Sequence, residues 1–287
     1  MKITRVAGAL GAVVDGVALA DASTDFAEIR RLLLEHEVLF FRDQFLTPEQ
    51  QIDFARRFGR PSTSPIAQLM GSTEPSLTTI IDTPDNPNLA DVWHTDLTWT
   101  AIPPTAAILC MEVIPEFGGD TLWASATKAF DMLSTPMQEM LRGLTATHDN
   151  EVFIASLMKK AAPERRALAD QLREKFPPVV HPVIRTHPET GRQAIMYADG
   201  GMRRINELSE HESRMVIDFI DRHVADPALH CRWSWREGDV AIWDERSTLH
   251  RAAADHVGQY RSIRRIEIDG DRPYFDPAGR TLAQLDQ

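Results

Sequence analysis

The chain carries three short runs near its end, CRWSW (231–235), DVAIWD (239–244) and RSIRRIEI (261–268), in which apolar residues alternate with polar ones. A period of two is typical of strands that are half buried, with one face on a core and the other face polar. Several such strands in succession predict an antiparallel sandwich or barrel. We therefore expect the last third of the protein, residues 231–269, to form a mainly β core.

Upstream of these runs, the sequence predicts helices that flank the β core. Residues 26–35 (FAEIRRLLLE) carry apolar side chains at helical spacing and lead into a buried strand at 37–41 (EVLFF). Thr47 followed by Pro48 is a typical helix start, for a helix that we expect to reach Phe58. The remaining expectations are a short strand pair at 11–19, a surface loop at 82–88 and helices at 137–141, 163–176 and 207–224.

The composition is that of a folded, acidic protein. Its 287 residues include 31 Lys and Arg against 42 Asp and Glu, a net charge of −11. Because nucleic acids and anionic membranes attract basic surfaces, this balance disfavours both as partners. The two cysteines predict no disulfide framework, and we see neither a secretion signal nor an apolar run long enough to span a bilayer. We expect one domain, residues 1–287, in the cytoplasm.

His94 and Asp96 place an imidazole and a carboxylate two positions apart, where an extended chain points both to one side. Such a pair more often belongs to a polar strand edge, so a metal site needs a third ligand, and His250 is the candidate. Two histidines and one carboxylate form the facial triad of non-haem Fe(II) oxygenases. The same ligands also suit a zinc hydrolase, and their spacing does not choose between the two metals.

Three arginines lie on the predicted strand that follows His250, at positions 261, 264 and 265. Arg261 and Arg265 are four apart on a predicted strand and therefore share a face. In an acidic protein, arginines on an inward face indicate bidentate binding of carboxylate, sulfonate or sulfate groups. A solvated strand edge is the alternative, which the position after a candidate metal ligand disfavours.

Taken together, the motifs resemble those of the Fe(II)/2-oxoglutarate-dependent dioxygenases of the taurine dioxygenase type. This TauD/TfdA family also includes aryloxyalkanoate dioxygenases and alkylsulfatases. The resemblance covers nearly the whole chain. It rests on FFRDQ (40–44), FARRFG (54–59), WHTD (93–96), PP (103–104), GGDTLW (118–123), HPV (181–183), RTHP (185–188), GDVAIWD (238–244) and residues 250–265.

The resemblance implies a specific fold and assembly. We expect an α+β protein with a mainly β core, a double-stranded β-helix or distorted jelly roll with flanking helices. An insertion separates the HxD motif, formed by His94 and Asp96, from the distal histidine, His250. We expect the helical part of this insertion at about 135–176. The resemblance also implies a homo-oligomer, a dimer or a tetramer.

The family pattern assigns the cofactor sites position by position. His94, Asp96 and His250 match its iron ligands. Thr121 and Arg261 match the residues that hold the distal carboxylate of 2-oxoglutarate. The reaction implied is the O2-dependent decarboxylation of 2-oxoglutarate to succinate, coupled to hydroxylation of a substrate carbon and requiring no enzymic general base.

The substrate implied is a small organic anion, whose acidic group we expect at Arg265 and at the backbone amide of Leu97. This chain lacks the sulfonate-binding histidine and two of the aromatic residues of taurine-type members. The substituted positions are Ser64, one of Ala67 and Gln68, and Gly201. We therefore expect a wider pocket for a bulkier or more apolar anion than taurine. Candidates for lining it, each of which more often packs in a core, are Trp99, Phe153, Leu157 and Met202.

The leading function is oxidation of an organic sulfonate or sulfate ester, with release of sulfite or sulfate. A carboxylate substrate, such as an aryloxyalkanoate or a natural-product acid, is the alternative within the family. Two further alternatives lie outside the family: a zinc hydrolase, and a non-catalytic jelly-roll protein that binds a metal or an anion. We expect Asp244 to support the strand and loop that carry His250, and the histidines at 148, 181 and 187 to be structural.

Overall fold

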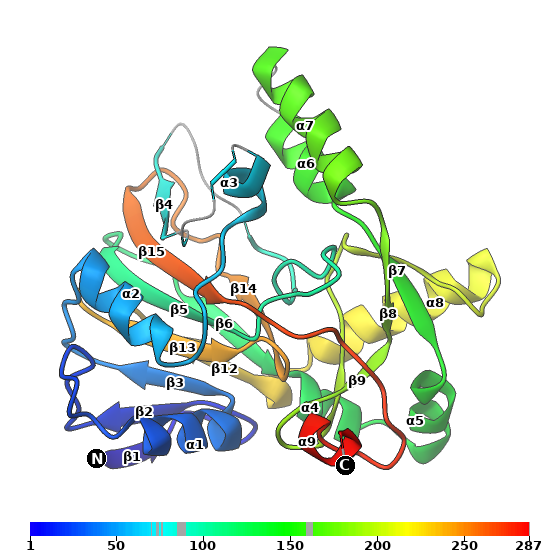
Figure 1. The fold of residues 1–287 in the computed structure, drawn as a ribbon, viewed down its shortest axis with the longest axis horizontal. Coiled ribbons are helices and arrows are strands. Elements are labelled where there is room, and N and C mark those ends of the chain that lie inside the picture. The colour runs from blue at the N-terminus through cyan, green and yellow to red at the C-terminus, as the bar shows by residue number, and fades with distance from the viewer. Residues whose placement is uncertain (70, 73–74, 76, 85–89, 159–162, 287) are drawn as a thin grey trace.

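The computed structural model describes residues 1–69, 71–72, 75, 77–84, 90–158 and 163–286 (Figure 1). Its centre is a seven-stranded sheet in the order β1-β2-β3-β13-β5-β15-β4, in which only β2 and β3 pair in parallel. The two outermost strands are polar and largely exposed, whereas β3 and β13 are completely buried. The strands of this large sheet are β1 (Lys2–Arg5), β2 (Ala12–Asp15), β3 (Val38–Phe41), β4 (Thr78–Asp82), β5 (Ala106–Val113), β13 (Val240–Asp244) and β15 (Arg261–Ile268).

A three-stranded sheet faces the large one, with β6 (Thr121–Ser125) paired between β12 (His230–Trp233) and β14 (Thr248–Ala252). Aromatic side chains from both sheets fill the space between them. Phe40 stacks on Trp233 with ring centroids 4.2 Å apart and meets the edge of Trp123 at 5.3 Å. Two antiparallel sheets joined by a shared core form the jelly roll that the sequence predicts.

Helices cover the outer face of the large sheet, at the lower left of Figure 1. The helix α1 (Phe26–His36) buries Ile29 and Leu33 against it, and α2 (Pro48–Arg56) buries Phe54. A capping box at the start of α2 pairs Thr47 with Gln50. These helices close one side of the sheet, so the face toward the smaller sheet remains for the site.

The remaining helices and short strands surround the two sheets. These helices are α3 (Pro65–Leu69), α4 (Ala126–Asp131), α5 (Thr135–Arg142), α6 (Glu151–Met158), α7 (Pro163–Lys175), α8 (Glu210–Val224), a 3-10 turn (Pro227–Leu229) and α9 (Leu282–Leu285). The short strands are β7 (Thr145–His148), β8 (Val179–Pro182), β9 (Ile184–Thr186), β10 (Gln193–Ile195) and β11 (Met202–Ile205). Figure 1 shows α6 and α7 projecting beyond the ends of β7 and β8. In the part of the chain described, no helix is long and apolar enough to cross a membrane.

Most of the predicted elements are present. The alternating runs form β12, β13 and β15, and the expected helices appear as α1, α2, α5, α7 and α8. The strand pair predicted at 11–19 is wrong, because β2 is the one strand in that range and its partner is β1. Of the loop predicted at 82–88, Asp82 is instead the buried last residue of β4, and residues 85–88 lie outside the described chain.

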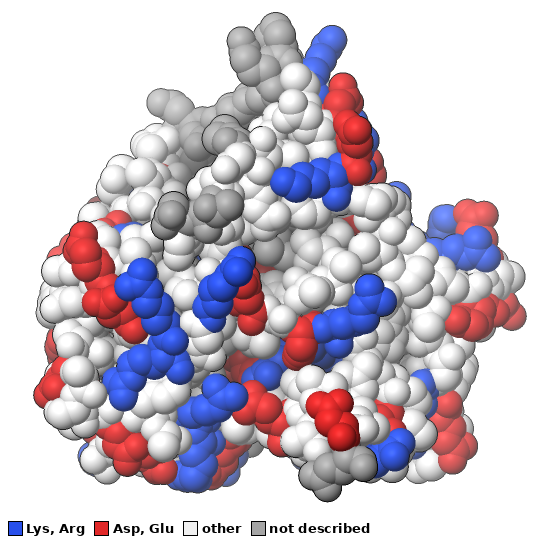
Figure 2. Space-filling model, viewed as in Figure 1, with Lys and Arg blue, Asp and Glu red and all other residues white. Residues whose placement is uncertain are grey.

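Charged side chains of both signs are interspersed over the face of the molecule that Figure 2 shows. No continuous basic surface is visible on that face. Neighbouring opposite charges are paired on several exposed helices, for example Arg31 with Glu28 and Glu35 on α1. Such pairs contribute little to stability, but they keep the surface potential low.

Candidate active site

The main chains of His94 and His250 are hydrogen-bonded to each other, which brings the two predicted metal ligands together. The N–H of His94 donates to the carbonyl of His250 at 3.1 Å, and the N–H of His250 donates to the carbonyl of His94 at 2.8 Å. Their ring centroids lie 4.2 Å apart. The regular strand β14 thus positions His250, and a backbone bridge to it positions the HxD segment.

Asp96 completes a group of three donors. His94 Nε2 lies 3.7 Å from Asp96 Oδ1, and His250 Nε2 lies 3.8 Å from Asp96 Oδ2. All three ligand atoms lie within 4.8 Å of one another. Metal–ligand bonds of about 2.1 Å place neighbouring ligand atoms roughly 3 Å apart, so a small contraction would let all three reach one ion.

The protonation of the three side chains also suits a metal. His94 Nδ1 lies 2.8 Å from the carbonyl of Val92, which makes Nδ1 the protonated nitrogen and leaves Nε2 free toward Asp96. Burial, with His94 beside it, lowers the pKa of His250 to about 3. Burial alone would raise the pKa of Asp96, but nearby Arg265 and the two histidines outweigh it, so the pKa lies well below its usual range. The site therefore presents a neutral His250 imidazole, the Nε2 of His94 and a carboxylate as possible metal ligands.

Two glutamates that sequence reasoning missed surround this carboxylate. Arg265 Nη1 lies 2.8 Å from Asp96 Oδ2, and Arg265 Nη2 lies 3.1 Å from Glu267 Oε1. Glu245 accepts the backbone N–H of Asp96 at 3.1 Å and the indole N–H of Trp243. Burial raises the pKa of Glu267 to about 7 and that of Glu245 well above its usual range. The available signal was the two-residue spacing of Arg265 and Glu267, which puts them on one strand face.

Arg261 and Thr121 lie at the other end of the same space. Both are buried, Arg261 with 4% of its surface exposed. The Nη1 of Arg261 lies 3.3 Å from Asp82 Oδ2, an oxygen that is also 3.1 Å from His256 Nε2. The Nε of Arg261 has no hydrogen-bond partner among the described residues. The Thr121 hydroxyl accepts the indole N–H of Trp235 at 3.0 Å.

A cavity of about 60 Å³ is lined by two of the three predicted metal ligands, His94 and His250, and by both residues predicted to hold 2-oxoglutarate, Thr121 and Arg261. Arg261, Ile263 and Arg265 enter it from alternate positions of β15. The other lining residues are Ile80, Ala90, His94, Leu109, Thr121, Trp243, His250 and Ala252.

A second cavity, of about 530 Å³, begins at Leu97, the residue after Asp96. Leu97 has φ +50°, a left-handed conformation that is uncommon for leucine. Three predicted substrate residues, Gln68, Leu97 and Trp99, line this cavity. Most of its other lining side chains are apolar. They are Pro65, Ala101, Ile102, Pro104, Phe176, Pro177 and Val179, with Ser62, Thr63, Thr100, Lys175, Asp269 and Gly270.

Other residues predicted for the substrate pocket lie elsewhere. The Ser64 hydroxyl accepts the N–H of Ala67 at 3.3 Å at the start of α3. Gly201 packs against Thr98, whose hydroxyl would be 3.2 Å from an added Cβ, and Met202 belongs to the core beneath the small sheet. Phe153 supports the cavity indirectly through its ring stacked 5.9 Å from Trp99. The side chain at position 157 is outside the described part.

The histidines expected to be structural contact protein groups away from the triad. His148 is completely buried with its ring 5.4 Å from His181, and burial together with His181 lowers its pKa to about 3. His181 Nε2 lies 3.0 Å from the carbonyl of Thr100. His187 Nε2 lies 3.1 Å from Asp244 Oδ2.

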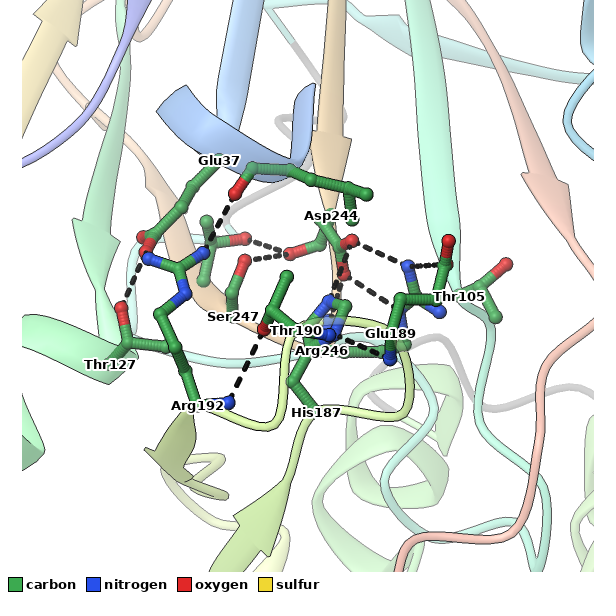
Figure 3. Close-up of polar contacts among 12 residues, drawn as sticks. Glu37, Thr105, Thr127, His187, Glu189, Thr190, Arg192, Asp244, Arg246 and Ser247 are labelled. Carbon is green, nitrogen blue, oxygen red and sulfur yellow. Dashed lines mark hydrogen bonds and ion pairs between the residues drawn. The ribbon is translucent and has the colours of Figure 1, made fainter. Parts of the chain in front are cut away.

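A polar network holds the turn between β13 and β14, as the expectation for Asp244 requires (Figure 3). Asp244 accepts two hydrogen bonds from the Arg246 guanidinium, at 2.7 and 2.9 Å, and its carbonyl accepts the hydroxyl of Thr248 at 2.8 Å. On the same side of the molecule, Arg192 forms a 2.9 Å ion pair with buried Glu37. These contacts fix the strand that carries the distal histidine.

Comparison with known proteins gives a consistent result. The family model described as "Taurine catabolism dioxygenase TauD, TfdA family" matches residues 2–266. The alpha-ketoglutarate-dependent sulfate ester dioxygenase of Pseudomonas putida is 36% identical over 281 residues, covering 95% of this chain and 91% of that protein. The alkylsulfatase of Acinetobacter baylyi is 33% identical over 279 residues, covering 94% and 86%. The structure of a taurine dioxygenase from Burkholderia xenovorans matches with a TM-score of 0.78 at 30% identity, covering 97% and 94%.

Proposed function

This chain belongs to the taurine catabolism dioxygenase TauD, TfdA family, and from that membership we propose that it hydroxylates a carbon of a bulky, largely apolar sulfate ester or sulfonate. It is an alpha-ketoglutarate (2-oxoglutarate)-dependent dioxygenase. The observation that carries the proposal is the position of Leu97. This residue joins the metal-binding triad to the apolar cavity of about 530 Å³, which has room for far more than a taurine-sized molecule.

His94, Asp96 and His250 fit an Fe(II) ion. Two imidazoles and one carboxylate are the donor set of non-haem iron oxygenases, and the three ligand atoms lie within 4.8 Å of one another. When bound, iron supplies the activation of O2 and the oxidation of the substrate carbon.

Arg261 and Thr121 would hold the far carboxylate of 2-oxoglutarate. Within the described part of the chain, the buried Arg261 Nε–H has no hydrogen-bond partner, so an incoming carboxylate would satisfy a donor that otherwise costs free energy. The Thr121 hydroxyl already accepts an indole N–H, which leaves its own proton to donate. The two contacts orient the 2-oxo acid toward the triad.

Arg265 and the N–H of Leu97 would bind the acidic group of the substrate. The left-handed backbone at Leu97 is an uncommon conformation of the kind that gathers at ligand sites. With the anion held there, the apolar tail would lie along Trp99 and Phe176 in the larger cavity. The names of the Pseudomonas and Acinetobacter relatives support a sulfate ester.

The products follow from the position of the new hydroxyl. On the carbon that carries a sulfate ester oxygen, the hydroxyl loses its proton as the C=O bond forms, and the bond from carbon to the sulfate oxygen breaks. An aldehyde and sulfate result. A sulfonate reacts in the same way, with cleavage of the carbon–sulfur bond and release of sulfite.

The test is turnover by protein reconstituted without O2. Metal-free protein receives Fe(II) and 2-oxoglutarate, then O2 with hexyl sulfate, hexanesulfonate or an aryloxyacetate, while succinate, sulfate and sulfite are measured. We expect succinate and an equal amount of sulfate or sulfite. Succinate with the aryloxyacetate alone would favour the carboxylate alternative. Sulfate release without O2 or 2-oxoglutarate would point to a zinc hydrolase.

Assembly and location follow the same family expectation. We propose a cytoplasmic homo-oligomer, a dimer or a tetramer, that acts on a small anion. Light scattering coupled to size-exclusion chromatography measures the mass directly against the 32.3 kDa of one chain. A single monomeric species at micromolar concentration would contradict this part of the proposal.

A further inference from the structure

The substrate arginine is surrounded by acidic groups. Asp96, Glu245 and Glu267 each expose 7% or less of their surface, and Arg265 is paired with two of them. Buried charges are stable when they are paired, and here three carboxyl groups share one guanidinium. A divalent ion at the triad would balance Asp96, which leaves Glu267 as the direct competitor for Arg265.

The geometry of the pair shows what an incoming anion meets. Glu267 Oε1 lies 3.1 Å from Nη2 of Arg265 without a hydrogen bond to it, and the Nε–H beside it is buried with no hydrogen-bond partner among the described residues. These two nitrogens form the edge of a guanidinium that binds an anion with two parallel hydrogen bonds. An anionic substrate at that edge must therefore displace the Glu267 carboxylate or lie against it.

We propose that Glu267 makes the site select monoanions over dianions, so that the enzyme accepts sulfate esters and excludes phosphate monoesters of the same shape. This inference rests on the proposed function, because it places the acidic group of the substrate at Arg265. A repulsive contact against the wrong ligand is an established route to specificity. Among the described residues, the other guanidinium that lines this cavity is that of Arg261, which faces Asp82 at the far end.

The two ligand classes differ chiefly in charge. A sulfate ester carries one negative charge, whereas a phosphate monoester, with a second pKa near 6, carries close to two at pH 8. Like charges placed side by side in a buried site are strongly unfavourable. We expect the wild-type protein to bind an alkyl sulfate at least about tenfold more tightly than the matched alkyl phosphate.

The strand offers a matched control one residue away. Arg264 Nε lies 3.1 Å from Glu112 Oε1, the same distance as in the pair of Arg265 with Glu267. Successive residues of β15 point to opposite faces, and Arg264 donates to the carbonyl of Leu46 near α2. Glu112→Gln therefore removes an equivalent ion pair away from the cavity.

The experiment measures binding rather than turnover. Hexyl sulfate and hexyl phosphate are titrated by calorimetry at pH 8 into protein that holds Fe(II) and 2-oxoglutarate without O2. The proteins are the wild type, Glu267→Gln, Glu112→Gln and Arg265→Ala. We expect Glu267→Gln to reduce the preference for sulfate about tenfold, mainly by tightening phosphate binding, and Glu112→Gln to keep it.

Each outcome bears on one claim. Equal wild-type affinities for the two ligands would overturn the selection by charge, even if Glu267→Gln fails to fold. An unchanged preference in folded Glu267→Gln would overturn the role of that residue. If Arg265→Ala binds hexyl sulfate as tightly as the wild type, or if the wild type binds neither ligand, the proposed function itself fails. If Glu112→Gln also lost the preference for hexyl sulfate, the preference would depend on the overall charge of the protein and not on Glu267.

Discussion

The carboxylate of Asp82 and the guanidinium of Arg261 lie 3.3 Å apart in the interior, although 179 positions separate them in the chain. The two residues belong to neighbouring strands, β4 and β15, that pair directly at this point. His256 lies 3.1 Å from the same carboxylate oxygen. Asp82 thus holds in place the arginine that we propose binds 2-oxoglutarate. A carboxylate of 2-oxoglutarate bound to Arg261 would therefore lie close to the carboxylate of Asp82.

Replacing Asp82 by Asn should destabilise the protein and increase the stabilisation that bound 2-oxoglutarate gives it. Breaking a buried ion pair leaves a charge without its partner and costs about 3–5 kcal/mol. The carboxylate of 2-oxoglutarate would then supply the missing charge, so its stabilising effect should be larger in the variant. Urea unfolding with and without 2-oxoglutarate measures both effects. Asp53→Asn, which alters an exposed pair with Arg56, should change neither.

Replacing Asp96 by Ala should abolish metal binding and succinate formation. The variant loses the one anionic ligand of the triad and leaves two imidazoles, which hold a divalent ion weakly. Metal content after gel filtration is the readout. Asp199→Asn is the control, since this carboxylate lies near His94 but outside the triad. An Asp96→Ala protein that keeps full activity would remove the metal assignment.

The stability of the protein should fall in acid through His148. Burial, with His181 beside it, lowers its pKa from 6.5 to about 3, so between these values the unfolded chain binds a proton that the folded chain does not. The contribution of His148 to the free energy of unfolding is fully present above pH 6.5 and is lost as the pH falls toward 3. Each unit of difference between the unfolded and folded pKa values changes the free energy of unfolding by about 1.4 kcal/mol. His148→Gln should flatten the curve of unfolding free energy against pH, and exposed His211→Gln should leave its slope unchanged.

Trp99→Ala should weaken the binding of long-chain substrates more than the binding of short-chain ones. The ring lines the larger cavity and stacks with Phe153, so its loss removes apolar contact from the tail and not from the acidic group. We expect a roughly tenfold loss of affinity for octyl sulfate and little change for ethyl sulfate. Calorimetric titration of both ligands gives the comparison. A uniform loss over chain lengths would instead place the ring at the anion.

The triad was predictable because its members sit in short, recognisable motifs. Glu245 was not identified, because its importance depends on segments that meet only in the fold: it accepts the backbone N–H of Asp96, 149 positions away in the chain. No local pattern in one sequence encodes that contact. Glu267 was also not identified, although its two-residue spacing from Arg265 on β15 was a local signal.

Errors in the predicted fold have a similar cause. The alternating runs of the last third stand out because one face is buried, whereas β1 is an edge strand with the polar sequence KITR and gives no such signal. The turn-forming residues after Asp82 made the whole segment look like a loop. Its first residue nevertheless closes β4, because pairing with Arg261 outweighs the local preference.

The reciprocal hydrogen bonds between His94 and His250 also bear on the order in which the molecule assembles. The two residues are far apart in the chain, so they meet only after a long loop has closed. Because the three ligands come together only when that loop is closed, we expect metal capture to follow folding, in contrast to small zinc domains that are unfolded without metal.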